Sequence, residues 1–113
     1  MKEIRAIIQP GRLYPVMTAI RDLPGSPAFA TSEIRGFPRG HADPLSRSHG
    51  IDAIDSFELV RVECIVKDEE VEGVVEAIRR AAHTGAPGDG KIFVYDVEAA
   101  IAIRTGTRGP AAV

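Results

Sequence analysis

Residues 84–91 have the composition of a loop that could hold phosphate groups. The segment reads Thr-Gly-Ala-Pro-Gly-Asp-Gly-Lys. Glycines allow the backbone to approach a ligand closely, and their N–H groups can cradle phosphate oxygens. Lys91 adds a compact positive charge at the loop exit. The segment is not a Walker A motif, because the spacing differs and no Ser or Thr follows the lysine. Taken alone, it is more typical of a turn between a helix and a strand, with Asp89 shaping that turn.

Two other segments carry arginines among turn-forming residues. Residues 35–40 read Arg-Gly-Phe-Pro-Arg-Gly, and residues 103–106 read Ile-Arg-Thr-Gly. Arg39 could reach a phosphate, although a lone loop arginine, like Arg104 near the C-terminus, is more often simply solvated. Three basic loops that converge on one site are far less expected by chance, so together they favour an anion-binding site.

The histidines and the cysteine are of the residue types that bind metal ions. His41 and His49 lie eight residues apart with Asp43 between them, a spacing that matches no standard metal site. Cys64 lies in a strand pattern that we expect to face the core, and His83 is remote in sequence. We therefore predict no metal centre, and His41 and His49 remain as candidates for a metal response in their loop.

Composition narrows the classes of protein. The chain has 113 residues with 14 Lys and Arg against 16 Asp and Glu, a net charge of −2. This excludes a nucleic-acid binder that relies on bulk positive charge. Cys64 has no partner for an internal disulfide. No apolar run approaches the roughly 20 residues that span a bilayer, and the N-terminus is no signal peptide. We expect a soluble cytoplasmic protein.

Hydrophobic periodicity predicts four strands and two helices in one domain, residues 1–113. The clearest strand covers residues 57–66, where apolar and charged residues mostly alternate, and Asp68 is a plausible N-cap for the helix that follows. Expected elements are a strand at 3–9, a helix from Leu13 or Tyr14 that stops before 24–27, strands at 28–35 and 57–66, a helix after Asp68 that ends at 84–85, and a strand at 91–97.

The order is β-α-β-β-α-β, which is typical of the α+β ferredoxin-like sandwich. Such a sheet is antiparallel in the middle and has both helices on one face. The other face would stay open, so we expect the chain to associate with other copies. About 20 residues connect the second and third strands, a length that is more often functional than inert.

Four segments together resemble the P-II signal-transduction family over nearly the whole chain. They are the opening Met1-Lys2-x-Ile4 with Ala6-Ile7-Ile8-x-Pro10, the segment Glu33-x-x-Gly36-Phe37-x-Arg39, the block Thr84-Gly85-x-x-Gly88-Asp89-Gly90-Lys91-Ile92-Phe93-Val94, and Ile103-Arg104-Thr105-Gly106. The resemblance implies a ferredoxin-like homotrimer that binds ATP or ADP, with Mg²⁺ as an accompanying ion, in clefts between subunits. Residues 37–56 would form the T-loop, which meets a target protein and responds to the nucleotide.

The resemblance also assigns the site residue by residue. The glycines and charged groups of the three loops would hold the phosphates, and apolar side chains would form the wall for adenine. The phosphate set is Gly36, Arg39, Gly88, Asp89, Gly90, Lys91 and Arg104, and the adenine wall is Ile7, Phe29 and Ile65.

The chain departs from the family pattern at functional positions. No Tyr occurs in residues 41–56, which excludes nucleotidylylation there, and Ser46 and Ser48 lie in no matching phosphorylation motif. Gly40 and Leu59 stand where the family has the Gln and Lys that hold Mg²⁺ and 2-oxoglutarate, so we predict weak or absent binding of that acid. Ala30, Ala86 and Ala102 replace further ligand-contacting residues, which would reduce phosphate affinity or favour ADP or AMP.

Three functions follow from these observations. The first is a non-enzymatic regulator that senses nucleotides and acts on a transporter or metabolic enzyme. The second is a slow ATPase, which Glu33 and Asp89 would serve, but no nucleophile–base pair is evident. The third is a metal-binding or structural trimer resembling the CutA proteins, for which the basic Gly-rich loop would be unnecessary. The first is our prediction.

Overall fold

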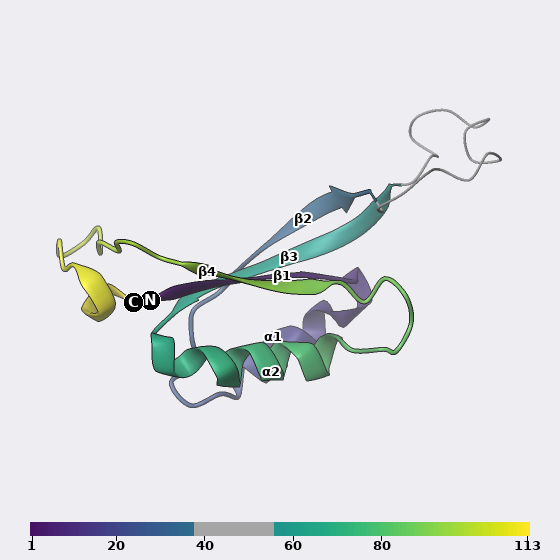
Figure 1. Ribbon diagram of the computed structural model, residues 1–113, viewed down its shortest axis with the longest axis horizontal. Coiled ribbons are helices and arrows are strands. Elements are labelled where there is room, and N and C mark those ends of the chain that lie inside the picture. Colours follow the sequence, from purple (N-terminus) through teal and green to yellow (C-terminus); the bar gives the residue numbers. More distant parts are fainter. Residues whose placement is uncertain (38–55) are drawn as a thin grey trace.

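The computed structural model describes residues 1–37 and 56–113 and contains one antiparallel sheet with two helices (Figure 1). The strands stand in the order β2-β3-β1-β4, so the two edge strands are β2 and β4. Their bounds, with those of the helices, are β1 Lys2–Ile8, α1 Leu13–Arg21, β2 Ala30–Gly36, β3 Phe57–Val66, α2 Val71–Ala82 and β4 Lys91–Asp96. This confirms the predicted ferredoxin-like order. The expected T-loop, residues 37–56, lies outside the described residues except at its ends.

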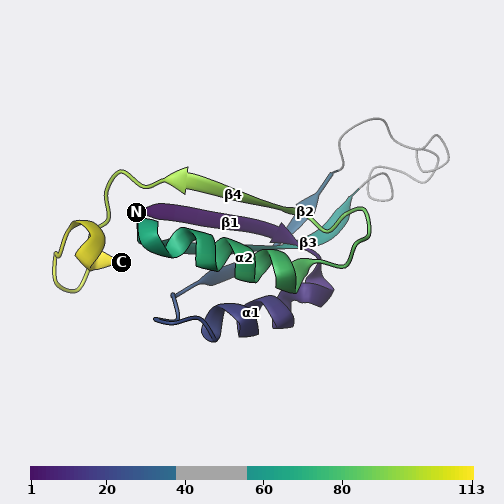
Figure 2. The ribbon, with the colours of Figure 1, turned by 60° about the horizontal axis from the view of Figure 1, so that its bottom comes forward.

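Both helices cover the same face of the sheet, as expected, and lie side by side (Figures 1 and 2). Pro15 lies in the first turn of α1, where its missing N–H costs no helical hydrogen bond. No helix among the described residues is long and apolar enough to cross a membrane.

The start of α2 differs from the prediction. Asp68 does not cap the helix; it begins a 3₁₀ turn, Asp68–Glu70, and its carboxylate accepts a hydrogen bond of 2.7 Å from the N-terminal ammonium of Met1. The carboxylate of Glu70 accepts from the backbone N–H of Lys67 at 3.0 Å. Glu70 therefore closes the turn. Asp68 bonds elsewhere because the end of β3 brings it beside the start of β1.

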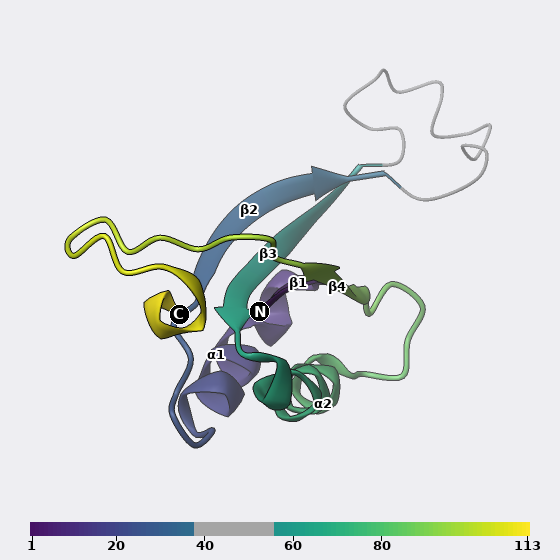
Figure 3. The ribbon, with the colours of Figure 1, turned by 60° about the vertical axis from the view of Figure 1, so that its left-hand side comes forward.

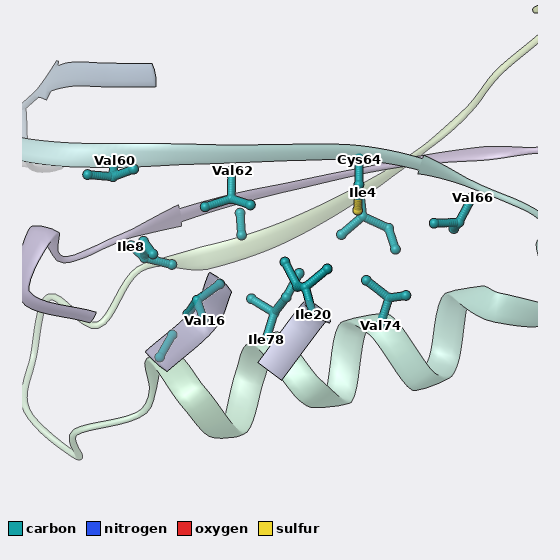
Figure 4. Close-up of a cluster of buried hydrophobic side chains, with 12 residues drawn as sticks. Ile4, Ile8, Val16, Ile20, Val60, Val62, Cys64, Val66, Val74 and Ile78 are labelled. Atoms are coloured by element: carbon teal, nitrogen blue, oxygen red, sulfur yellow. The ribbon is translucent and has the colours of Figure 1, made fainter. Parts of the chain in front are cut away.

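The core lies between the sheet and the two helices and is wholly apolar among the described residues (Figure 4). Cys64 belongs to it, as predicted, and burial raises the pKa of its thiol to about 11. A buried neutral thiol at this position is a packing group and a poor nucleophile. The core residues are Ile4, Ala6, Ile8, Val16, Ile20, Val60, Val62, Cys64, Val66, Val74, Ile78 and Ala82.

The second face of the sheet carries no helix (Figure 2). Side chains alternate along a strand, so Glu3, Arg5 and Ile7 lie opposite the buried residues of β1. Phe93 and Tyr95 of β4 pair with Arg5 and Glu3 and share this open face, where each is more than 40% exposed. An open face with exposed aromatic side chains is the surface on which another chain could pack.

The two ends of β4 lead to different regions (Figures 1 and 3). At its start, Lys91 pairs with Ile7, and the Gly-rich loop, residues 83–90, extends beyond this end of the sheet. At its other end, Asp96 pairs with Lys2. The C-terminal tail, residues 97–113, continues from there as a short hairpin, with Ile101 bridged to Arg108, and finishes in the 3₁₀ turn Gly109–Ala112.

Candidate functional site

Asp89 organises the first half of the Gly-rich loop. Its carboxylate accepts hydrogen bonds from the backbone N–H groups of Thr84, at 2.8 Å, and Gly85, at 2.9 Å, and from the Thr84 hydroxyl. The Thr84 hydroxyl oxygen in turn accepts from the N–H of Ala86 at 3.2 Å. Asp89 therefore shapes this turn, and these bonds engage its carboxylate before any ligand enters.

The same contacts set the charge state of Asp89. Hydrogen bonds from the Thr84 side chain and backbone, and then from Gly85, lower the pKa of its carboxyl below the ordinary value, and nearby His83 adds to the effect. The carboxylate is therefore ionised at neutral pH and holds the loop as an acceptor only.

Gly90 brings the loop back onto the sheet through a conformation that requires glycine. Its φ is +101°, and a Cβ at this position would lie 1.7 Å from the carbonyl oxygen of Ile7. A side chain is excluded by this contact and by the backbone angle together. Gly88 also has a positive φ, +97°. The motif glycines thus have a structural reason to be present, whatever the loop binds.

A cleft of about 850 Å³, the loop cleft, lies where the Gly-rich loop meets the base of the β2–β3 hairpin. It is lined by the loop, by the end of β1, by the end of β2 and by the start of β3. Six predicted site residues line it, namely Ile7, Gly36, Gly88, Asp89, Gly90 and Lys91. Gly36 and Phe37 of one basic segment are thus brought to the same cleft as residues 86–91 of another.

A second cleft of about 630 Å³, the tail cleft, contains the other two apolar residues of the predicted adenine wall. Phe29 and Ile65 line it together with Glu63. Ala100 and Val113 of the C-terminal tail also line it. The volume of each cleft falls in the range of small-molecule sites.

The three residues of the predicted adenine wall, Ile7, Phe29 and Ile65, do not lie together within one chain. Ile7 pairs with Arg61, whereas Ile65 pairs with Glu3, four positions away on β1. At about 3.3 Å per residue these positions are about 13 Å apart along the sheet. Within one chain, Ile7 therefore lies apart from Phe29 and Ile65, and an adenine wall formed by all three between subunits stays a prediction.

The remaining candidates are also apart from the loop cleft or outside the described residues. Arg104 lies in the C-terminal tail, which continues from the end of β4 opposite the Gly-rich loop (Figure 1), and it is exposed. The convergence of all three basic loops is thus not reached in one chain. Arg39, His41 and His49 lie outside the described residues. Among the described His, Cys, Asp and Glu residues, no group of three or more could hold a metal ion.

A charged cluster lies on the open face, and two of its members, Glu3 and Glu63, line the tail cleft. The Nε atoms of Arg61 and Arg5 are 2.7 Å and 3.5 Å from Oε1 of Glu63, and Nη2 of Arg5 donates to Glu3 at 3.2 Å. The Arg5 guanidinium also lies 5.2 Å from the centre of the Tyr95 ring. The Arg61–Glu63 contact has the distance of an ion pair without the alignment of a hydrogen bond. These groups leave the open face polar at its centre.

Gln9 and Glu63 are among the cleft residues that were missed from sequence. Gln9 lines the loop cleft and donates from Nε2 to the carbonyl oxygen of Gly88, and Glu63 lines the tail cleft. The available signal for Gln9 was its place directly before the Pro10-Gly11 turn, at the end of the strand that pairs with Lys91. For Glu63, it was the shared face with Ile65.

The fold and the loop cleft define a small ferredoxin-like protein with a candidate phosphate site. A sequence model of the family described as nitrogen regulatory protein P-II matches residues 1–107. The chain belongs to the P-II family, whose members with this name are regulatory proteins.

Individual relatives agree over the full length. The nitrogen regulatory protein P-II of Rhodospirillum rubrum is 42% identical over an alignment of 115 residues, which covers all of this chain and all of that protein. That of Bradyrhizobium diazoefficiens is 43% identical over 111 residues, which cover 96% of each chain. The nitrogen regulatory protein GlnK2 of Haloferax mediterranei is 42% identical over 116 residues, which cover all of this chain and 91% of that protein.

Proposed function

We propose that this P-II family member is a non-enzymatic, cytoplasmic signalling protein that binds ATP or ADP between the subunits of a homotrimer. Nucleotide binding at the loop cleft changes the T-loop, residues 37–56, which regulates a transporter or a metabolic enzyme. The observation that carries the proposal is the loop cleft itself, where Gly88–Lys91 and Gly36 line one cavity. A phosphate held by the Gly-rich loop would thus lie beside the first residues of the T-loop.

The separation of the two clefts supports a site shared between subunits. Ile7 and the Gly-rich loop lie at one end of the sheet, whereas Phe29, Ile65 and the tail that carries Arg104 lie at the other. In a ring of identical chains, the loop cleft of one subunit meets the tail cleft of the next. The six predicted residues of the first cleft and the two of the second then form one nucleotide site, with Arg104 supplied by the tail.

The open face supports the association. Phe93 and Tyr95 expose 43% and 44% of their surface there. The charged cluster of Arg5, Arg61, Glu3 and Glu63 combines two positive and two negative groups, so copies that face one another can exchange ion pairs instead of repelling. These features suit a partly polar interface between copies of the chain.

The described residues of the loop cleft argue against a second ligand of the 2-oxoglutarate type. Leu59 occupies the position of the expected lysine, lines the cleft, and packs so close to Gly36 that a Cβ there would be 2.6 Å from its Cδ1. An apolar side chain leaves a carboxylate without a charge partner. Mg²⁺ would enter with the nucleotide, because Asp89, the acidic residue lining this cleft, is already engaged by the loop.

The test is a calorimetric titration of the purified protein with ATP and then ADP in the presence of Mg²⁺, with GTP as the control nucleotide. We expect saturable binding near one adenine nucleotide per subunit and no tightening when 2-oxoglutarate is added. Light scattering after size exclusion should give three times the mass of one chain. Absence of saturable binding to ATP and ADP would contradict the nucleotide proposal, and a monomer mass would contradict the shared site.

Regulation is tested separately. Limited proteolysis of the segment 37–56 should change its rate when ATP saturates the protein. Steady hydrolysis of ATP well above background that is abolished by Lys91→Ala would instead favour an enzyme.

A further inference from the structure

Gln9 contacts the Gly-rich loop from outside the motif. It follows β1 directly and precedes the 3₁₀ turn Pro10–Arg12. Its side-chain Nε2 donates a hydrogen bond to the carbonyl oxygen of Gly88, 79 residues away in sequence. Gln9 and Gly88 both line the loop cleft. The contact therefore joins the end of β1 to the loop at the site where the proposed phosphates would bind.

The two ends of the loop are fixed by other contacts. Asp89 binds the N–H groups of Thr84 and Gly85, and the Thr84 hydroxyl binds the N–H of Ala86. At the far end, Lys91 pairs with Ile7 in the sheet. Pro87 has no N–H to donate, and Gly88 has the backbone freedom of glycine. Within the described residues, the bond from Gln9 is the side-chain contact that holds the carbonyl of Gly88.

Holding this carbonyl has a direct consequence for anion binding. A trans peptide is planar, so its carbonyl and its N–H point in opposite directions. The chain has no cis peptide bond among the described residues. When Gln9 holds the Gly88 carbonyl, it also fixes the direction of the Asp89 N–H in the same peptide. A rotation of this peptide would exchange the positions of a donor and a carbonyl oxygen, and a carbonyl oxygen repels a phosphate.

We infer that Gln9 is a positioning residue that holds the Gly88–Asp89 peptide in the orientation in which the loop binds phosphate. The inference rests on the proposed function and adds a residue that the loop motif does not contain. Gln9 acts through the loop, so its effect depends on the phosphates of the ligand and not on the base.

The test variant is Gln9→Met, which has nearly the same length and removes the donor without adding charge. Its affinity for ATP and for adenosine is compared with that of the wild-type protein by titration. We expect ATP to bind about 3- to 10-fold more weakly, the effect of one net hydrogen bond. Adenosine, which carries no phosphate, should bind with unchanged affinity. Amide hydrogens of residues 84–90 should exchange faster in the nucleotide-free variant.

The variant Gln9→Lys keeps a donor at this position. It should restore slow exchange in residues 84–90, which a general effect of changing the residue would not do. Gln9 has an exposed contact with the loop, so both variants should unfold at the same denaturant concentration as the wild type.

The outcomes separate the inference from the proposed function. If the wild-type protein fails to bind ATP, both are overturned. If it binds ATP and Gln9→Met binds equally well with unchanged loop exchange, only the inference is overturned. Equal losses for ATP and adenosine would also overturn it, because they would indicate a general structural role.

Discussion

The two faces of the sheet are built from the same strands but by different chemistry. The face under α1 and α2 contributes only apolar side chains to the core, and Ile4, Val66 and Ile78 are fully buried (Figure 4). The open face alternates with it residue by residue and carries charges, exposed aromatic rings and some of the residues that line each cleft. Every second residue of β1 and β3 therefore serves the core, and the residues between them are available for binding.

This difference predicts that stability and binding respond to different substitutions. The core face has no polar group among the described residues, so its changes should act through packing alone. The open face and the Gly-rich loop have few buried groups, so their changes should act on ligands and on association. The following experiments separate the two, and all unfolding measurements are made at one protein concentration because association adds to stability.

The largest effect on stability is expected for Ile78→Ala in α2. Ile78 is fully buried between the helix and the sheet, so the substitution leaves a cavity. The free energy of unfolding should fall by about 2–5 kcal/mol, measured by urea denaturation. Ile65→Ala on the open face is the matched control, because its side chain is 38% exposed, and it should cost less than the core substitution. Equal costs would show that the open face is packed as tightly as the core.

Gly90→Ala should damage both properties, because Gly90 joins the loop to the sheet. The new Cβ would be 1.7 Å from the Ile7 carbonyl oxygen, and φ is +101°. The loop must move, and we expect a loss of about 1–3 kcal/mol in unfolding free energy together with weaker ATP binding.

Gly106→Ala is the control for backbone strain alone. Gly106 also has a positive φ, +72°, but beyond its two chain neighbours no heavy atom lies within 4 Å of its added Cβ. It should cost about 1–2 kcal/mol, the ordinary penalty for this conformation, without a steric clash. If Gly90→Ala costs no more than Gly106→Ala, the contact with Ile7 is relieved without displacing the loop.

The regular part of the fold was largely predictable from the sequence. Alternation along residues 57–66 gave β3 with its observed bounds, because each position of this strand faces either the core or the open face. Pro15 and the spacing of apolar residues placed the start of α1. The prediction that Asp68 caps α2 was wrong, because its carboxylate accepts a hydrogen bond from the N-terminal ammonium, which is distant in sequence. A local pattern cannot indicate such a partner.

The candidate site was predictable in its segments but not in its arrangement. The Gly-rich loop and Gly36 were identified from residue types and lie in one cleft. The separation of Ile7 from Ile65 depends on the register of β1 with β3, which residue types do not specify. The bond between Gln9 and Gly88 likewise depends on the pairing of β1 with β4. Distant pairings decide which residues meet.

Lys91→Ala should affect binding without affecting stability. Lys91 lines the loop cleft and is exposed at the start of an edge strand, so its removal leaves no cavity in the core. Loss of a charge-assisted contact should weaken ATP binding by about 1–3 kcal/mol, measured by titration. Lys67→Ala is the control, since Lys67 lines neither the loop cleft nor the tail cleft and should leave binding unchanged. Unchanged affinity in Lys91→Ala would remove Lys91 from the site.

The smallest effect is a pH dependence of the loop through Asp89. Hydrogen bonds from Thr84 and Gly85 lower the pKa of its carboxyl in the folded protein. The stabilisation is therefore fully present above the unfolded pKa of about 4 and is lost as the pH falls through the lower folded pKa. Asp89→Asn lacks this ionisation, so it should be less stable than the wild type at neutral pH.

The difference between the two proteins should shrink as the pH falls below about 4. Other acidic groups with lowered pKa values, Glu76 beside Arg79 and Asp68 beside the N-terminus, are common to both proteins and cancel in the comparison. Denaturant midpoints between pH 7 and pH 3, with amide exchange at Thr84 and Gly85, measure the effect. If the stability difference between Asp89→Asn and the wild type stays constant with pH, the loop depends on the shape of the Asp89 side chain and not on its charge. The loop, like the core, would then be stabilised by packing and hydrogen-bond geometry alone.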